Sequence, residues 1–365
     1  SPLEIALLFI FYEFFGVVTN LVGGYLGARM GLNRTMNIGL FLQIVALAML
    51  AVPAAMLTVP WVMAAQALSG IAKDLNKMSA KSGIKLLVPD EQQGTLYKWV
   101  AILTGSKNTL KGVGFFLGGV LLMAAGFTGA VILMAVALGL VWLASLFLLG
   151  QDLGKSKAKP KFSEILSKSR AINVLSAARM FLFGARDVWF VVALPVSMAT
   201  AFGWPHWIVG GFMSSWIIGY GFIQPIALRI TGHSNGKSGA VFWAALLAVV
   251  PAAIAGALMA GWSAQAVVIG GLLLFGVLFA INSSLHSYLI VSYARGDGVS
   301  LDVGFYYMSN AAGRLLGTIL SGWIYQAYGL EACLWISAAL VATAAVLSVW
   351  LPERANKPIG EKGYV

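Results

Sequence analysis

Charged residues are scarce in this 365-residue chain. They make up 10% of it, whereas a soluble domain carries about 25%. Hydrophobic residues account for 59% and the mean hydropathy is +0.86. Since one membrane-spanning helix uses about 20 apolar residues, this composition over such a length predicts many spans rather than one anchor. We therefore expect an integral membrane protein.

The residues of catalytic and metal sites are also few. Cys333 is the one cysteine, which excludes an internal disulfide and a cysteine-based metal site. The three histidines, His206, His233 and His286, are scattered. The sequence contains no H-E-x-x-H, G-x-S-x-G or Walker pattern. A membrane-embedded enzyme is therefore not expected, nor is a metal or a cofactor. A sensor or scaffold built on a transporter fold would be expected to carry an appended soluble domain, and the sequence shows none.

Apolar segments separated by short polar breaks are the main feature of the sequence. Eleven are expected, at about 3–26, 36–57, 60–83, 95–125, 129–150, 171–196, 204–230, 238–260, 263–292, 300–327 and 330–351. The loops between them are alternately basic and free of Lys and Arg. The basic ones hold Arg29 and Arg34; Lys81 and Lys85; Lys155 to Arg170; Arg229 and Lys237; and Arg295.

Basic loops are cytoplasmic by the positive-inside rule. This places Ser1 outside and the tail after Leu351 inside, which requires an odd number of spans. Because the sequence begins with neither Met nor a signal peptide, we expect one helix to be missing upstream. The net charge of +11 follows from the loops, and no nucleic-acid partner is expected.

The longest hydrophilic stretch, 151–170, holds five lysines and divides the helices six plus six when the missing upstream helix is counted. We interpret it as a cytoplasmic basic linker. The expected organisation is an N-terminal half (1–150), this linker, a C-terminal half (171–352) and a cytoplasmic tail (353–365). The fold class is an all-α membrane protein with two six-helix halves around a central cavity and the first helix missing.

The two halves contain a short internal repeat. Lys111–Gly119 aligns without gaps on Arg314–Gly322, so that a cation, a glycine and a pair of small residues coincide. Parallel repeats of this kind are common in transporters, and the two stretches occupy helices 5 and 11 of a twelve-helix fold. The alignment predicts that Lys111 and Arg314 face one another across the central axis; the alternative is a chance match between glycine-rich helices.

Charged side chains inside the spans are the strongest functional signal, because each costs several kcal/mol in a bilayer unless it faces a cavity or a partner. Spacings of four and seven residues place them on shared helix faces. An excess of cations over acids then requires an anionic ligand, and Arg and Lys suit phosphate or arsenate groups. The predicted substrate-binding cations are Lys73, Lys77, Lys107, Lys111, Arg179, Arg186 and Arg314, against the acids Asp74 and Asp187.

Several of these residues have a second interpretation. Four can reach the cytoplasmic surface by snorkelling: Lys73, Lys77, Lys107 and Arg179. Arg186 and Asp187 can form a structural pair. Glu13 either titrates during proton-coupled transport or packs as a protonated group. Asn282, His286 and Tyr288 either bind ligand or join helices.

The stretch Gly24–Arg34 resembles the signature loop between helices 2 and 3 of the major facilitator superfamily. The matching positions, which we expect to form a gating loop, are Gly24, Arg29, Gly31 and Arg34. Ala28 stands where the family has an Asp. The usual Asp-centred gating contact is therefore not expected here.

Four stretches together resemble the ArsJ branch of that superfamily: Ser1–Arg34, Gln66–Lys81, Thr104–Phe116 and Ser169–Pro195. The resemblance implies a multi-pass permease of the bacterial inner membrane that exports 1-arseno-3-phosphoglycerate, supplied by a glyceraldehyde-3-phosphate dehydrogenase that uses arsenate. We expect a monomer in lipid that carries a small anionic substrate. The same basic cavity would also serve an organophosphate or phosphate exchanger, and the direction of transport is not visible in the sequence.

Overall fold

The computed structural model describes residues 1–89, 91–150, 153–156, 169–232 and 236–352. Regular structure in these ranges is helical throughout, as the predicted fold class requires. Six of the described helices are long and apolar enough to cross a membrane. The helices are α1 (Pro2–Met30), α2 (Leu32–Leu50), α3 (Val59–Leu87), α4 (Gln93–Leu148), α5 (Arg170–Phe190), α6 (Ala193–Thr200), α7 (His206–Thr231), α8 (Lys237–Met259), α9 (Ala264–Tyr293) and α10 (Val299–Ser348), with a 3-10 turn, η1 (Ala54–Met56).

The longest helices, α4 and α10, each contain two of the predicted spans. Both break at a glycine with positive φ, Gly126 (65°) in α4 and Gly329 (80°) in α10, a conformation that glycine adopts without steric cost. With α5 and α6 counted as one interrupted span, the described residues form helical segments at all eleven predicted positions. Extending the repeat alignment of Lys111 with Arg314 also brings Gly126 onto Gly329.

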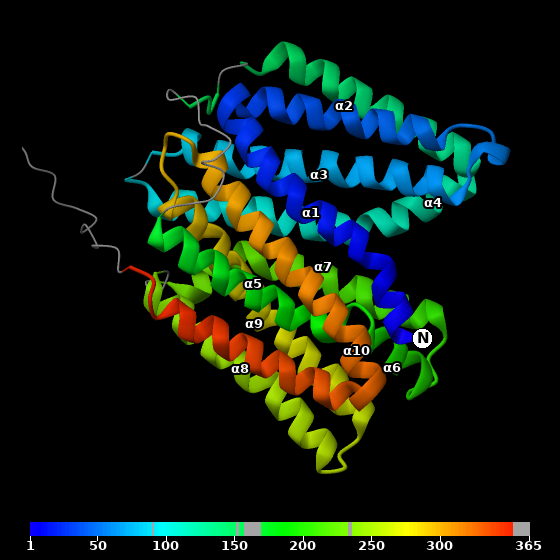
Figure 1. Cartoon of the computed structure of the whole chain (residues 1–365), viewed down its shortest axis with the longest axis vertical. Helices are drawn as coiled ribbons and strands as arrows, with labels where there is room; N and C mark the ends of the chain where they lie inside the picture. The colour runs from blue at the N-terminus through cyan, green and yellow to red at the C-terminus, as the bar shows by residue number, and fades with distance from the viewer. Residues whose placement is uncertain (90, 151–152, 157–168, 233–235, 353–365) are drawn as a thin grey trace, which may run out of the picture.

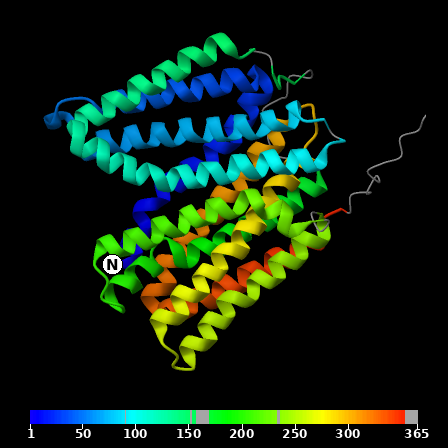
Figure 2. The ribbon, with the colours of Figure 1, turned by 180° about the vertical axis from the view of Figure 1, so that it is seen from behind.

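The helices form two groups joined along two seams. In Figure 1, α2, α3 and α4 lie together, while α5, α8, α9 and α10 form the other group. α1 runs diagonally alongside α10, and Figure 2 shows the second seam, where α7 lies beside α4. A Cβ atom on Gly24 of α1 would lie 3.0 Å from the Cα of Gly304 in α10. Small residues therefore allow the backbones of the two groups to approach closely.

Two predicted loops are shorter than expected. Lys81 and Lys85 were expected in a basic loop, but α3 continues to Leu87 and buries them at 2% and 8% exposure. This prediction is wrong because no proline interrupts the chain between Lys81 and Pro89. Lysine content indicated a loop, whereas the side chains face the interior.

The predicted gating loop is almost entirely helical. Gly24 and Arg29 belong to α1, where Arg29 donates a hydrogen bond to the Tyr25 hydroxyl, and the exposed Arg34 belongs to the first turn of α2. Gly31 alone separates the helices, because its φ of 99° turns the chain within one residue. Most of the predicted basic linker (151–152 and 157–168) and the tail (353–365) lie outside the described residues.

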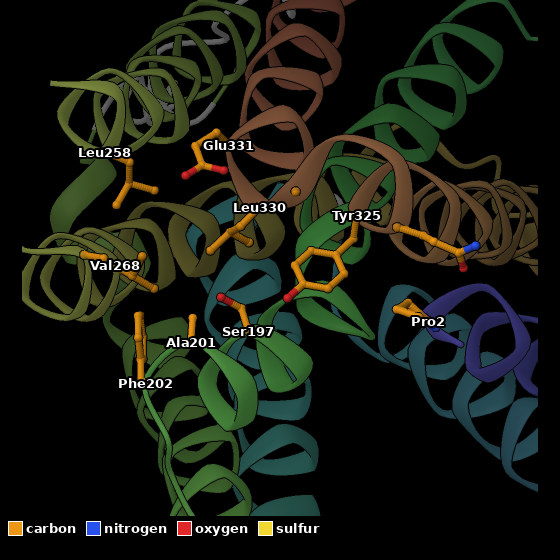
Figure 3. A pocket seen from close by; sticks show the side chains of 12 residues that line it. Pro2, Ser197, Ala201, Phe202, Leu258, Val268, Tyr325, Leu330 and Glu331 are labelled. Carbon is orange, nitrogen blue, oxygen red and sulfur yellow. The ribbon is translucent and has the colours of Figure 1, made fainter. Parts of the chain in front are cut away.

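A cavity of about 490 Å³ lies beside the break in α10 (Figure 3). Tyr325 and Leu330 from α10 and Val268 from α9 line it, together with Phe202 after α6. Most of this lining is apolar, with Glu331 at its edge. The predicted charged site residues do not line this cavity in the described part of the chain.

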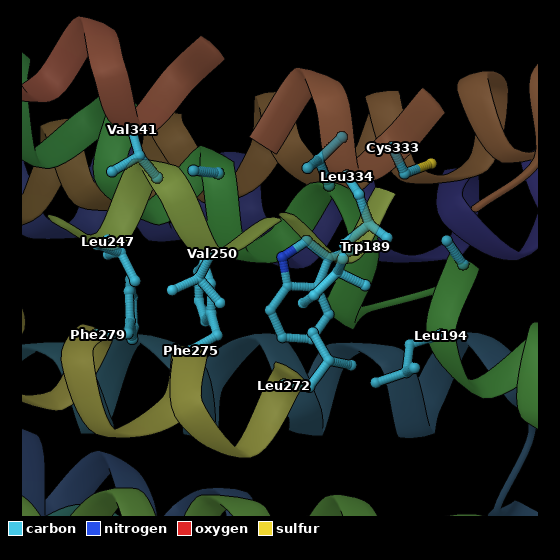
Figure 4. Packing of buried hydrophobic residues seen from close by; sticks show 14 of the residues in the cluster. Trp189, Leu194, Leu247, Val250, Leu272, Phe275, Phe279, Cys333, Leu334 and Val341 are labelled. Carbon is cyan, nitrogen blue, oxygen red and sulfur yellow. The ribbon is translucent and has the colours of Figure 1, made fainter. Parts of the chain in front are cut away.

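A packed aromatic core supports α5, the helix that carries Arg179 and Arg186. Trp189 of α5 meets Phe275 of α9 edge-on, with ring centroids 5.1 Å apart. Leu247 and Val250 of α8 and Leu334 and Val341 of α10 belong to the same cluster (Figure 4). Cys333 is fully buried in the same cluster, as a small apolar side chain.

Candidate functional site

A pocket of about 680 Å³ lies between the two groups of helices. Residues from α1, α3, α4, α5, α7, α9 and α10 line it. All ten of the charged residues predicted inside the spans reach it: Glu13, Lys73, Asp74, Lys77, Lys107, Lys111, Arg179, Arg186, Asp187 and Arg314. The structure thus brings together residues that are up to about 300 positions apart in the chain, as the hydrogen bond between Arg314 and Glu13 illustrates.

Equivalent positions of α4 and α10 line the pocket. The alignment that pairs Lys111 with Arg314 also pairs Lys107 with Asn310, and all four residues face the pocket. Thr104 and Asn108 pair in the same way with Tyr307 and Ala311, which line it too. The internal repeat read from the sequence therefore coincides with a repeated wall of the pocket.

Arg314 is the centre of a charge network that joins three helices. It forms an ion pair with Glu13 of α1, and its Nε lies 3.2 Å from Asp187 Oδ2 on α5. The other oxygen of Asp187, Oδ1, lies 2.5 Å from Arg186 Nη2. Asp187 is fully buried and Glu13 is 4% exposed, so these carboxylates are desolvated and depend on their arginine partners.

A second, smaller network lies on α3. Lys77 Nζ is 2.7 Å from Asp74 Oδ1, and Asn20 of α1 donates a hydrogen bond of 3.0 Å to Asp74 Oδ2. The Lys77 ammonium also lies 4.2 Å from the centre of the Tyr307 ring, which is cation–π distance. Asp74 thus has partners at both oxygens.

Arg179 is held inside the protein rather than at the membrane surface. It is 3% exposed, and its Nε donates to Asn310 Oδ1 at 2.9 Å. Its Nη1 donates to the backbone oxygen and to the hydroxyl of Ser283, both at 3.3 Å. The guanidinium lies 3.9 Å from the Phe183 ring centre. The snorkelling interpretation is therefore wrong for Arg179, because α9 and α10 hold its polar end.

Lys81 is a lining residue that the sequence analysis missed. It lies 5.0 Å from the centre of the Tyr307 ring. Its position continues the spacing of Lys73 and Lys77 by four residues, so one face of α3 presents three lysines. That spacing was the available signal, and assigning Lys81 to a loop concealed it.

The neutral residues predicted on α9 join helices. Asn282 donates to the backbone oxygens of Trp243 and Leu278. The Tyr288 hydroxyl donates to Gln93 Oε1 at 3.1 Å, and its ring stacks on Tyr97 at 4.7 Å. Neither Asn282, Tyr288 nor the buried His286 lines the pocket, so the helix-contact alternative holds for Asn282 and Tyr288.

The pocket is closed at the end of the helices where α4 begins. Its lining on α3 runs from Met63 to Lys81. Beyond Lys81, an apolar cluster containing Tyr97, Leu285 and Val303 joins the two groups of helices. The predicted orientation makes this closed end cytoplasmic.

The family follows from a comparison of the whole chain. The family model described as Major Facilitator Superfamily matches residues 1–301 and again residues 175–364. The chain belongs to the major facilitator superfamily. Members of this family are secondary transporters, so this chain is a secondary transporter and not an enzyme. Its several apolar helices make it a multi-pass membrane protein.

Solved structures share the fold of this transporter at low sequence identity. The human organic anion transporter MFSD10 superposes with a TM-score of 0.72 at 18% identity, over 93% of this chain and 83% of its own. The proton:xylose symporter XylE gives 0.74 at 13%, over 96% and 89%. A bacterial homologue of the iron transporter ferroportin, in an outward-facing state, gives 0.67 at 17%, over 94% and 92%. A search of curated proteins found no match.

Proposed function

We propose that this transporter exports an organoarsenical anion, 1-arseno-3-phosphoglycerate, across the bacterial inner membrane and so gives arsenate resistance. The observation that carries the proposal is the charge of the central pocket. Eight cations line it against three acids, and buried charges of one sign require a counter-charge. The specific compound rests on the resemblance of four stretches of the sequence to the ArsJ branch.

The chemistry of this compound suits a pocket whose cations come from both groups of helices. One end carries an arsenate group and the other a phosphate group, and Arg and Lys bind such oxyanions through charge-assisted hydrogen bonds. An arsenate-using glyceraldehyde-3-phosphate dehydrogenase would supply the compound. Export would remove it before hydrolysis returns arsenate to the cytoplasm.

Proton coupling is part of this proposal. Glu13 forms an ion pair across the seam between α1 and α10. Protonation of this carboxyl would remove one of the two acidic partners of Arg314 and free donors for a substrate anion. Transport driven by a pH gradient is then expected to fail in a Glu13→Gln variant, while substrate binding persists.

The test is arsenic efflux from cells that express the transporter with or without an arsenate-using dehydrogenase. We expect efflux that requires the dehydrogenase and that falls in Lys111→Gln and Arg314→Gln. A Lys98→Gln variant, altered on α4 outside the pocket, serves as the control and is expected to retain efflux. Transport of phosphate esters that is independent of arsenate would contradict the proposal and favour an organophosphate exchanger.

A further inference from the structure

Six of the eight cations that line the pocket form two clusters at different levels along the helices. α4 provides Lys111 nearer its break and Lys107 one turn earlier, and α5 provides Arg186 and, two turns earlier, Arg179. We define the outer cluster as Lys111, Arg186 and Arg314, which accompany the acids Glu13 and Asp187. We define the inner cluster as Lys81, Lys107 and Arg179.

The two clusters differ in charge compensation. In the outer cluster, Glu13 and Asp187 form ion pairs with Arg314 and Arg186. In the inner cluster, none of the three cations has an ion pair with a carboxylate of the described residues. The charges that act on Lys81 are Arg179, Lys107 and Lys77, all cations.

Asp74 does not supply the missing negative charge. It acts on Lys107 from a distance, but its two oxygens are bonded to Lys77 and Asn20. Lys81 and Arg179 are only 2% and 3% exposed. Like charges gathered in this way repel one another, and burial of two of them adds a desolvation cost, unless an anion joins them.

Arg179 also has donors available for that anion. Its Nε and Nη1 are fixed by Asn310 and Ser283, while Nη2 has no hydrogen bond to a described residue. Because the first two donors hold the guanidinium plane, the remaining group points in one direction without further loss of side-chain freedom. Lys81 and Lys107 add two point charges from α3 and α4.

We propose that the inner cluster, in preference to the outer one, binds one tetrahedral, doubly charged oxyanion group of the substrate, a phosphoryl or arsenyl group. The assignment rests on the proposed function, since it names the part of the pocket that holds a dianionic end. Lys81, Lys107 and Arg179 are then the residues that select such a group over a carboxylate. The outer arginines are paired with Glu13 and Asp187 as long as Glu13 is ionised.

The experiment measures binding of inorganic phosphate to the purified transporter in nanodiscs of zwitterionic lipid, by calorimetry. Lys81→Gln and Lys107→Gln are expected to weaken binding at least tenfold. Lys111→Gln is expected to weaken it by a smaller factor than either of these two variants. Lys85→Gln is the matched control and is expected to leave the affinity unchanged. Lys85 is buried on α3, as Lys81 is, but does not line the pocket. Lys107 faces the pocket and is exposed, so its variant tests the site even if Lys81→Gln folds poorly.

An equal loss of affinity in Lys111→Gln, or unchanged affinity in Lys81→Gln and Lys107→Gln, would overturn the assignment. A parallel titration with 3-phosphoglycerate separates this outcome from failure of the proposed function. If that ester binds through Lys111 and Arg314 while the inner variants bind normally, the inner assignment falls and anion transport stands. If neither anion binds to the unaltered protein, both fall.

A phospholipid headgroup presents the same phosphoryl chemistry. Repeating the phosphate titration in nanodiscs that contain anionic phosphatidylglycerol distinguishes the two sources. Unchanged affinity supports a substrate group as the occupant. Affinity that falls as the anionic lipid rises would assign the inner cluster to a headgroup and overturn the proposal.

Discussion

The equivalent helices α4 and α10 line the pocket with corresponding positions but differ in how their charges are compensated. Arg314 of α10 contacts both Glu13 and Asp187. Its counterpart on α4, Lys111, has no ion pair with a carboxylate in the described part of the chain. The two cations thus occupy equivalent positions in the pocket, but the acids around them differ. Arg314 connects three helices through its ion pairs, whereas Lys111 is available to a ligand.

Removing the acid on which the arginines depend is expected to have the largest effect. Asp187→Asn leaves Arg186 and Arg314 without the carboxylate that joins them, and breaking a buried ion pair costs about 3–5 kcal/mol. We expect a large fall in the thermal unfolding midpoint of the detergent-purified protein. An unchanged midpoint would show that the network is not structural.

The second-largest effect is expected from the two equivalent cations, whose replacement should change the stability of the protein to different extents. Arg314→Gln leaves Glu13 and Asp187 with weaker partners, at a cost of about 1–3 kcal/mol, whereas Lys111→Gln removes no ion pair and is expected to preserve stability. Thermal unfolding of the two variants side by side measures the difference. Equal destabilisation would contradict the contrast between α4 and α10.

A pair of equivalent glycines sharpens the same comparison. A Cβ on Gly317 of α10 would lie 2.6 Å from the backbone oxygen of Gly184, whereas a Cβ on Gly114 of α4 meets nothing within 4 Å. Gly317→Ala is therefore expected to destabilise the protein by about 1–3 kcal/mol. Gly114→Ala is the control, for which a comparable loss would refute the packing difference.

The smallest expected effect lies at the closed end, where α4 meets α9. Tyr288→Phe removes the hydrogen bond to Gln93 but keeps the ring stacked on Tyr97, at a cost of about 1 kcal/mol. We expect faster labelling of a cysteine introduced at Thr104 by a reagent added from the cytoplasmic side. Labelling that is no faster than in the Thr104→Cys protein alone would mean that this bond does not hold the end closed.

Much of the fold could be predicted because a bilayer imposes simple requirements. Span length and hydropathy placed the eleven helical segments, and the glycines that divide α4 and α10 lie between predicted spans. Helix ends were less predictable. Lys81 was placed in a loop because lysine is usually exposed, and Gly24–Arg34 was expected to be a loop although Gly31 alone makes the turn.

The sequence by itself determined which charges must lie away from lipid, because desolvation makes an unpaired charge in hydrocarbon too costly wherever it occurs along the chain. Only the tertiary structure decided their partners, since Glu13, Asp187 and Arg314 meet through the packing of α1, α5 and α10. It also decided that Lys81 joins Lys107 and Arg179 in a cluster in which no cation has an ion pair with a carboxylate of the described residues. Electrostatic compensation depends on distance and burial in three dimensions, and helical spacing determines only the face on which a charge lies.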